Sequence, residues 1–158
     1  PSNSETNVEI TDEDGCVRSL DQLFMDGPAV FHFAVYKIPD VIKQAIHKAG
    51  LAIEDFDMVL LHQANKTMVD LIYRALSVPK EKRFYFLEDV GNSAGASLPT
   101  LLAEAWREGV IKPGTRTLLC AFGGGLSWGV AAIKWPENAD AAVPGSVDVT
   151  FVPVGERL

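Results

Sequence analysis

The chain of 158 residues contains few basic side chains, few cysteines and no long apolar run. Its 14 lysines and arginines stand against 21 aspartates and glutamates, which gives a net charge of −7. This balance disfavours nucleic acid as a partner, because nucleic-acid-binding surfaces are cationic. No apolar stretch approaches the ~20 residues of a membrane-spanning helix, and the first residues lack the features of a signal peptide. Two cysteines do not form a disulfide framework, so we expect a reduced, cytoplasmic protein.

Groups that bind metals or attack substrates are also scarce. The three histidines show no close ligand spacing and the two cysteines lie far apart, so we expect no metal or redox cofactor. Cys120 stands in the apolar run Leu118–Phe122 and is expected to be buried. Cys16 follows an acidic turn, which raises the pKa of a thiol. The sequence therefore contains no convincing cysteine nucleophile.

The pattern of apolar residues predicts an α/β domain. The predicted helices cover residues 29–49 with a break at Pro39, residues 66–76, and a segment capped by Ser97 and ended by Gly109. The predicted strands cover residues 58–61, 84–87, 115–122 and 127–135. Alternating strands and helices indicate a largely parallel sheet, but the last two strands are joined by too few residues for a crossover and must be antiparallel.

We divide the chain into three parts. Residues 1–28 are polar and rich in turns, and we expect an extended N-terminal segment there. Residues 29–135 form the α/β domain. Residues 136–158 form a C-terminal tail, in which the alternating run Val147–Val152 is a candidate strand.

Two polar residues follow neighbouring predicted strands. His62 comes directly after residues 58–61, and Asn92 follows residues 84–87. Ligands of open α/β sheets bind beyond the carboxyl ends of parallel strands, so we expect a pair of hydrogen-bond donors at one edge of the sheet. Taken singly, each residue has a simpler explanation, His62 as a structural histidine and Asn92 as a turn residue.

Three consecutive glycines, Gly123–Gly125, link the last two predicted strands. They are explained either as a hairpin turn or as a loop whose backbone N–H groups approach a ligand, since glycine has no Cβ. The spacings of a dinucleotide fingerprint and of a phosphate-binding loop are both missing. The chain thus offers donors for an oxyanion without a nucleophile.

Three ordered motifs carry a family resemblance. They are His62–Asn65, Gly91–Ala94 with Ala96 and Ser97, and Ala121–Gly125 with Trp128 and Gly129. Together they resemble the C-terminal half of 3-oxoacyl-(acyl carrier protein) synthase III, a condensing enzyme of the thiolase superfamily. The resemblance runs from near Met25 to Trp135. The pairing of a histidine with Asn92 points to the type III ketosynthases rather than to the Cys-His-His elongating enzymes.

The resemblance implies a thiolase-like half, with a mixed, mostly parallel sheet flanked by helices and a final antiparallel strand pair. It implies a decarboxylative Claisen condensation in which His62 and Asn92 donate hydrogen bonds to the thioester carbonyl of a malonyl extender. Gly124 would supply a backbone N–H of the oxyanion hole, Asn65 would contact the pantetheine arm, and Phe122 would shape the acyl pocket. No metal or redox cofactor is implied.

The implied partners are acyl carrier protein, coenzyme A thioesters, and an N-terminal half of the same protein that carries the nucleophilic cysteine. Neither Cys16 nor Cys120 matches that cysteine, so we expect the isolated chain to be inactive. The resemblance further implies fatty acid biosynthesis and a homo-oligomer, without nucleic acid or membrane. Two alternatives stay open: a non-catalytic partner subunit or acyl-binding module, and a secondary-metabolite acyltransferase of the same superfamily.

In this family the two halves pack through a shared layer of helices. Without the first half, we expect an uncovered apolar surface near residues 93–97 and along the stripe Leu98, Leu101, Leu102 and Ala105. Such a surface favours self-association, or a tail that folds back over it. The run Val147, Val149 and Phe151 of the tail is expected either to cover part of this surface or to add a strand to an open sheet edge.

Overall fold

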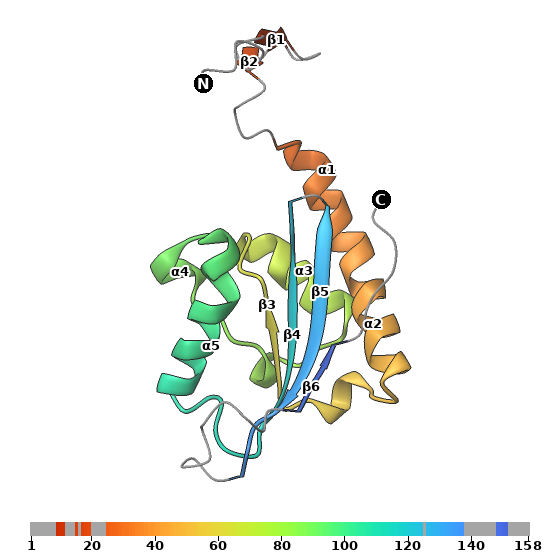
Figure 1. The fold of residues 1–158 in the computed structure, drawn as a ribbon, viewed down its shortest axis with the longest axis vertical. Helices are drawn as coiled ribbons and strands as arrows, with labels where there is room; N and C mark the ends of the chain where they lie inside the picture. The colour runs from red at the N-terminus through yellow and green to blue at the C-terminus, as the bar shows by residue number, and fades with distance from the viewer. Residues whose placement is uncertain are drawn as a thin grey trace, which may run out of the picture.

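The computed structural model describes residues 9–11, 15, 17–19, 25–124, 126–137 and 148–151 (Figure 1). Its α-helices are α1 (Gly27–His32), α2 (Ile38–Lys48), α3 (Lys66–Ala75), α4 (Leu87–Val90) and α5 (Ser97–Arg107). Shorter helical turns are the π-helical η1 (Phe33–Lys37) and the 3-10 turns η2 (Ile53–Asp55), η3 (Lys80–Lys82) and η4 (Ala94–Ala96). The strands are β1 (Glu9–Thr11), β2 (Val17–Ser19), β3 (Met58–Leu61), β4 (Arg116–Gly123), β5 (Ser127–Lys134) and β6 (Asp148–Phe151).

The main sheet has the strand order β3-β4-β5-β6. β3 and β4 are parallel, whereas β5 is antiparallel both to β4 and to β6. A mixed sheet flanked by helices confirms the predicted fold class, including the antiparallel pair on either side of the glycine-rich turn. The parallel part is limited to one pair of described strands, because one predicted strand does not form. β1 and β2 make a separate antiparallel pair.

The predicted strand at residues 84–87 is wrong. Only Arg83 joins the sheet in this region, through a single parallel bridge to Val59. The backbone N–H of Phe86 donates instead to Oε1 of Gln63, with an N···O distance of 3.4 Å, and helix α4 begins directly afterwards. A hydrogen bond to a buried side chain thus replaces the strand pairing that the apolar residues favour.

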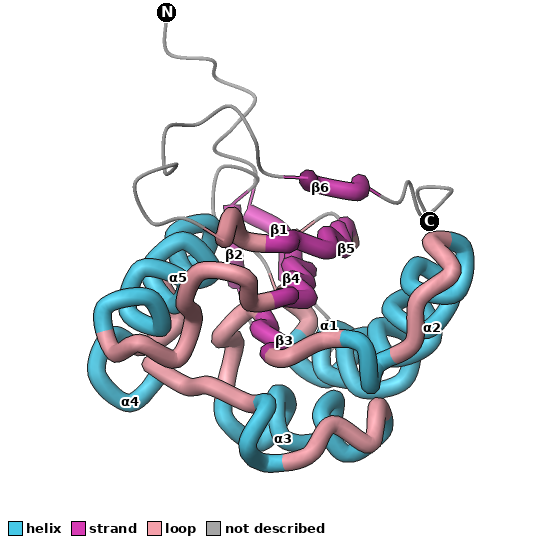
Figure 2. Tube along the Cα trace, turned by 90° about the horizontal axis from the view of Figure 1, so that it is seen from below, coloured by secondary structure: helices cyan, strands magenta, loops and turns pink. Residues whose placement is uncertain are grey.

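Each face of β3 packs against a different group of helices. Val59 and Leu61 belong to a cluster with side chains of η1, α2 and α3, while Met58 and Leu60 pack with α5. All four side chains are buried, as the apolar run predicted. Figure 2 shows α5 and α2 on opposite sides of the strands. The polar residues after β3 are therefore held between two packed layers.

The helical run over residues 29–49 divides near Pro39, as predicted. It consists of α1, η1 and α2, and Pro39 is the second residue of α2. Proline has no N–H to donate to the carbonyl of Val35, and the wider π-helical turn lies directly before this position. The run begins where the Asp26 carboxylate accepts a hydrogen bond from the Ala29 N–H at 2.9 Å.

Helix α5 covers the second face of β3 with the apolar stripe that the sequence indicates. Leu101 and Ala105 have no exposed surface, and Leu98 and Leu102 pack at the margin of the same cluster. The sheet covers the middle of the stripe, so the expectation of an uncovered stripe is wrong for Leu101 and Ala105.

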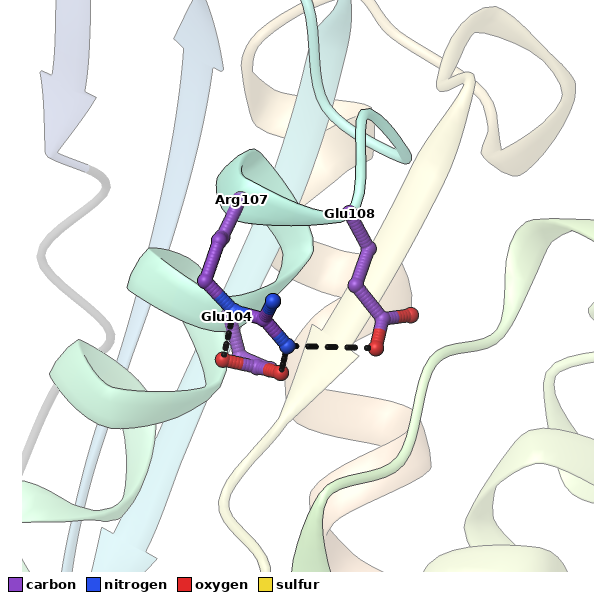
Figure 3. Close-up of polar contacts among 3 residues, drawn as sticks. All are labelled: Glu104, Arg107 and Glu108. Carbon is purple, nitrogen blue, oxygen red and sulfur yellow. Dashed lines mark hydrogen bonds and ion pairs between the residues drawn. The ribbon is translucent and has the colours of Figure 1, made fainter.

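Exposed charged groups occupy the C-terminal end of α5 (Figure 3). Nε of Arg107 donates to Oε2 of Glu104 at 2.9 Å, and a terminal nitrogen of Arg107 contacts Glu108 at 3.7 Å. The hydrogen bond from Arg107 lowers the pKa of the Glu104 carboxyl. Exposed pairs of this kind stabilise a fold only slightly.

Strand β6 extends the main sheet beyond β5. The pairing runs from Ala131 with Phe151 to Lys134 with Asp148, and β6 lies within the alternating run Val147–Val152. Among the described helices, none has the length and apolar character needed to cross a membrane.

Candidate active site

His62 directly follows β3 and lies against the end of β4. Its backbone N–H donates to the Cys120 carbonyl at 2.8 Å, which extends the pairing of the two strands. Its ring meets the Phe122 ring edge-on, with 5.4 Å between centroids. Burial lowers the pKa of the imidazole below its usual value of 6.5, because the charged form loses hydration. The side chain is therefore a neutral donor or acceptor near pH 7.

Asn65 fixes the start of helix α3. Its Oδ1 accepts a hydrogen bond from the Met68 N–H at 2.8 Å, as an N-cap residue does. The residue is exposed, and its amide nitrogen has no partner within the described residues. A donor group is thus presented beside the loop that carries His62.

Asn92 lies in a tight turn between α4 and α5. Gly91 precedes it with φ +66° and ψ −164°, a conformation that is essentially restricted to glycine. The Asn92 Oδ1 accepts a hydrogen bond from the Ala94 N–H at 3.0 Å, and Ala94 itself has φ +48°. Because the oxygen is engaged, the exposed amide NH₂ of Asn92 is the group left to donate.

The turn between β4 and β5 is the third part of the candidate site, after the loop that follows β3 and the turn that contains Asn92. Phe122 is buried near the end of β4, and Gly124 is exposed in the turn. The Gly124 carbonyl accepts a hydrogen bond from Ser127 Oγ at 2.7 Å, and no atom lies within 4 Å of the place a Cβ would occupy. Gly125 lies outside the described residues.

The structure joins the loop after β3 to the start of α5 through a hydrogen bond between two residues of the family motifs, a contact that the sequence did not predict. The Gln63 N–H donates to Ser97 Oγ at 2.8 Å, and both residues are 2% exposed. Ser97 was expected to cap α5, but the cap position belongs to Ala96 and the Ser97 hydroxyl faces Gln63 instead. The sequence signal for Gln63 was its place in the motif His62–Asn65, to which no role of its own was assigned.

The structure brings some of the predicted site residues into direct contact and links the others only through neighbouring residues. His62 and Phe122 are in ring contact, and Asn65 caps the helix that follows His62. Asn92 is linked to this region through Gln63 and the start of α5. Gly124 lies just beyond Phe122, in the turn at the end of β4.

A basic cavity of about 450 Å³ lies beside α3. Its lining residues are Lys66, Asp70, Arg74, Lys80, Arg83 and Tyr85. The Tyr85 hydroxyl donates to Asp70 at 2.6 Å, and Lys66 Nζ lies 4.4 Å from the centre of the Tyr85 ring. Four cationic side chains against one carboxylate make this cavity positive on a chain of net charge −7.

Neither cysteine is placed as a nucleophile by the described structure. Cys120 is fully buried, and burial raises the pKa of its thiol to about 12. Cys16 lies outside the described residues. Within the described residues no group of three histidine, cysteine or carboxylate side chains is arranged to hold a metal ion.

Residues 46–135 match the family described as 3-Oxoacyl-[acyl-carrier-protein (ACP)] synthase III C terminal. The Beta-ketoacyl-[acyl-carrier-protein] synthase III of Rhodopirellula baltica is 40% identical over 132 residues, which is 84% of this chain and 37% of the relative. The corresponding synthase of Thermosynechococcus vestitus is 39% identical over 111 residues, which is 70% of this chain and 34% of the relative. The chain therefore spans 34–37% of the length of these curated relatives.

Solved structures show the same likeness. The 2.1 Å crystal structure of a 3-oxoacyl-(acyl-carrier-protein) synthase III matches with a TM-score of 0.76 and 30% identity, over 85% of this chain and 40% of that chain. The 3-oxoacyl-[acyl-carrier-protein] synthase III of Aquifex aeolicus matches with a TM-score of 0.68 and 35% identity, over 80% and 39%. The chain belongs to the 3-oxoacyl-(acyl carrier protein) synthase III family, has the thiolase-like fold, and matches the C-terminal part of that family.

Proposed function

We propose that the chain forms the C-terminal catalytic half of a type III ketosynthase, which condenses an acyl thioester with malonyl-(acyl carrier protein). Residues 29–135 are the catalytic unit in this proposal, residues 1–28 precede it in the chain, and the tail of residues 136–158 contains β6 (Asp148–Phe151), which extends its sheet. The proposal rests on His62, a largely neutral imidazole packed on Phe122 where β3 and β4 end. Ligands of α/β sheets bind at such an edge.

His62 and Asn92 act on the malonyl thioester as neutral hydrogen-bond donors. The bond between the malonyl Cα and its carboxylate breaks, CO₂ leaves, and the electron pair moves into the thioester carbonyl to form an enolate. Donors aimed at that oxygen stabilise the charge as it develops. The lowered pKa of His62 keeps the imidazole neutral, and the Ala94 N–H leaves the Asn92 NH₂ free to donate.

The enolate carbon then attacks an acyl thioester held by a cysteine of the N-terminal half. A carbon–carbon bond forms, the carbon–sulfur bond breaks, and the cysteine leaves as a thiolate. The Gly124 N–H stabilises the oxyanion of this step, and Phe122 shapes the space for the acyl chain. The amide nitrogen of Asn65 contacts the pantetheine arm. The nucleophile comes from the other half, because Cys120 is buried.

The basic cavity beside α3 provides a docking surface for the thioester carrier. Lys66 lies directly after Asn65, so the cavity begins next to the expected path of the pantetheine arm. Positive side chains attract the phosphate groups that acyl carrier protein and coenzyme A carry on this arm. Charge complementarity of this kind mainly raises the rate of association.

The test joins this chain to the cysteine-bearing N-terminal half of the Aquifex aeolicus relative, in place of that protein's own C-terminal part. The His62→Ala and Asn92→Ala changes should each lower malonyl decarboxylation by about 10²–10³-fold, the loss typical of an oxyanion donor. Acylation of the N-terminal cysteine should change little. Stopped-flow measurement of CO₂ release and intact-mass measurement of acylation separate the two steps.

The matched control is His47→Ala, which removes an exposed histidine of α2 and should leave both steps unchanged. Equal losses of decarboxylation and acylation in the His62 and Asn92 variants would show that their roles are wrongly assigned. The unfused chain should acquire no acyl group from acyl-coenzyme A, and a stoichiometric adduct on either of its cysteines would contradict the proposal.

A further inference from the structure

Gln63 is a buried polar residue whose backbone and side chain make three hydrogen bonds. Its backbone N–H donates to Ser97 Oγ at 2.8 Å, and its Nε2 donates to the Leu61 carbonyl at 2.9 Å. Its Oε1 accepts a longer hydrogen bond from the Phe86 N–H, at 3.4 Å. Only 2% of the residue is exposed, so water does not compete for these hydrogen bonds.

The contacts of Gln63 fall on both ends of one segment. Phe86 directly precedes α4, and Ser97 is the first residue of α5. Asn92 lies between them, after Gly91 and before the turn η4. Gln63 therefore holds the two stems of the loop that presents Asn92, one through its side chain and the other through its backbone.

The same residue is fixed relative to His62. The two are neighbours in the chain, and the His62 N–H is itself bonded to the Cys120 carbonyl of β4. The Gln63 side chain also returns to the carbonyl of Leu61, the last residue of β3. The end of the sheet and the Asn92 loop thus share one buried connection.

We propose that Gln63 and Ser97 are positioning residues that set the separation of His62 and Asn92 for the decarboxylation step. This inference rests on the proposed function of that pair. An amide and a hydroxyl suit the task because both are uncharged and do not favour protonation of the neighbouring imidazole. Donors for a developing oxyanion must be held in place before reaction, and a displacement of 1 Å can lower a rate by about 10²-fold.

Amide hydrogen exchange on the full chain measures the strength of the hydrogen bonds that join Gln63 to Ser97 and Phe86. In the Ser97→Ala variant the Gln63 N–H loses its acceptor, and we expect its exchange to become about tenfold faster. Loss of the Ser97 bond should also loosen the Gln63 side chain that accepts from the Phe86 N–H, so this amide should exchange faster too. Ser97→Thr keeps a hydroxyl and should restore slow exchange.

Two further variants complete the exchange experiment. Gln63→Met removes the side-chain bonds but keeps the backbone bond to Ser97, so it should speed exchange at Phe86 more than at position 63. Thr100→Ala is the matched control, since it removes a hydroxyl one turn further along α5. The Thr100 hydroxyl has no bonding partner in the described part of the chain, and both amides should keep their exchange rates.

The catalytic readout uses the fusion with the Aquifex aeolicus half. Ser97→Ala and Gln63→Met should lower the rate constant of decarboxylation by about 10–10²-fold, with little change in KM or in acylation of the cysteine. Ser97→Thr should recover most of the lost rate. A residue that only stabilises the fold would lower both steps in proportion to the folded fraction.

The outcomes separate this inference from the proposed function. If His62→Ala slows decarboxylation while Ser97→Ala and Gln63→Met do not, the pair is catalytic and the positioning role is wrong. Unchanged exchange at Gln63 and Phe86 in Ser97→Ala would also overturn the positioning role. If His62→Ala has no effect on decarboxylation while the exchange results hold, the proposed function fails and Gln63 is a structural connection only.

Discussion

The imidazole of His62 shows how one residue acquires its chemistry from its surroundings. The side chain is only half-buried, yet its burial against the Phe122 ring and the end of β4 lowers its pKa. Its position after an apolar run indicated the edge of a sheet, which the structure confirms. The lowering of the pKa was not readable from the sequence, because it depends on residues about 60 positions away that pack against the ring.

The lowered pKa makes folding stability depend on pH. As pH falls through about 6.5, the unfolded chain protonates this histidine while the folded chain resists. The contribution of neutral His62 to the free energy of unfolding is therefore fully present above pH 6.5. It is lost as the pH falls toward the pKa of His62 in the folded state. His62→Gln should remove it, so the free energy of unfolding of the variant should fall less between pH 7.5 and 5 than that of the wild type.

Urea denaturation at several pH values measures this difference. The other two histidines are common to both proteins, so their contributions cancel in the comparison. Parallel pH profiles for wild type and His62→Gln would mean that burial does not perturb the imidazole.

At the scale of elements, local patterns were reliable where tertiary contacts agree with them. β3 and α3 lie where the apolar spacings placed them, and the helical run divides beside Pro39. The predicted strand at residues 84–87 and the predicted cap of α5 were wrong, and in both places the structure has a hydrogen bond to Gln63 instead. The side chain of Gln63 bonds the backbone at Phe86, and its backbone N–H engages the Ser97 hydroxyl. Hydrogen bonds between distant segments have no local signature.

Besides its apolar contacts, helix α3 is joined to β3 by a buried hydroxyl. The Tyr73 OH donates to the Val59 carbonyl at 2.7 Å, and the side chain has no exposed surface. Tyr73→Phe keeps the ring but leaves that carbonyl without this donor, so we expect a loss of about 1–3 kcal/mol in the free energy of unfolding.

Chemical denaturation of the full chain measures the loss. Tyr36→Phe is the matched control, because Tyr36 is 65% exposed and its hydroxyl has access to water. The tyrosine of α3 would have no stabilising role if the two variants unfolded at the same denaturant concentration.

At the scale of the molecule, net charge does not predict where the charged side chains gather. The chain has a net charge of −7, yet four cations line one cavity beside α3. These side chains come from α3 and from residues 80–85, which the sequence separates by a turn. Only the packing of the two segments brings them together, so composition alone could not reveal the cavity.

Strand β6 covers the edge of β5 in the main sheet. β6 pairs with β5 from Ala131 to Lys134, so removing it would leave the N–H and C=O groups of this edge without their partners. Exposed strand edges pair with other chains. A chain that ends at Glu137 lacks β6 and should unfold at a lower urea concentration and self-associate, whereas a chain that ends at Phe151 keeps β6 and should do neither. Light scattering over a range of concentrations compares the two with the full chain. A monodisperse monomer of full stability in the shorter form would show that the edge of β5 needs no partner.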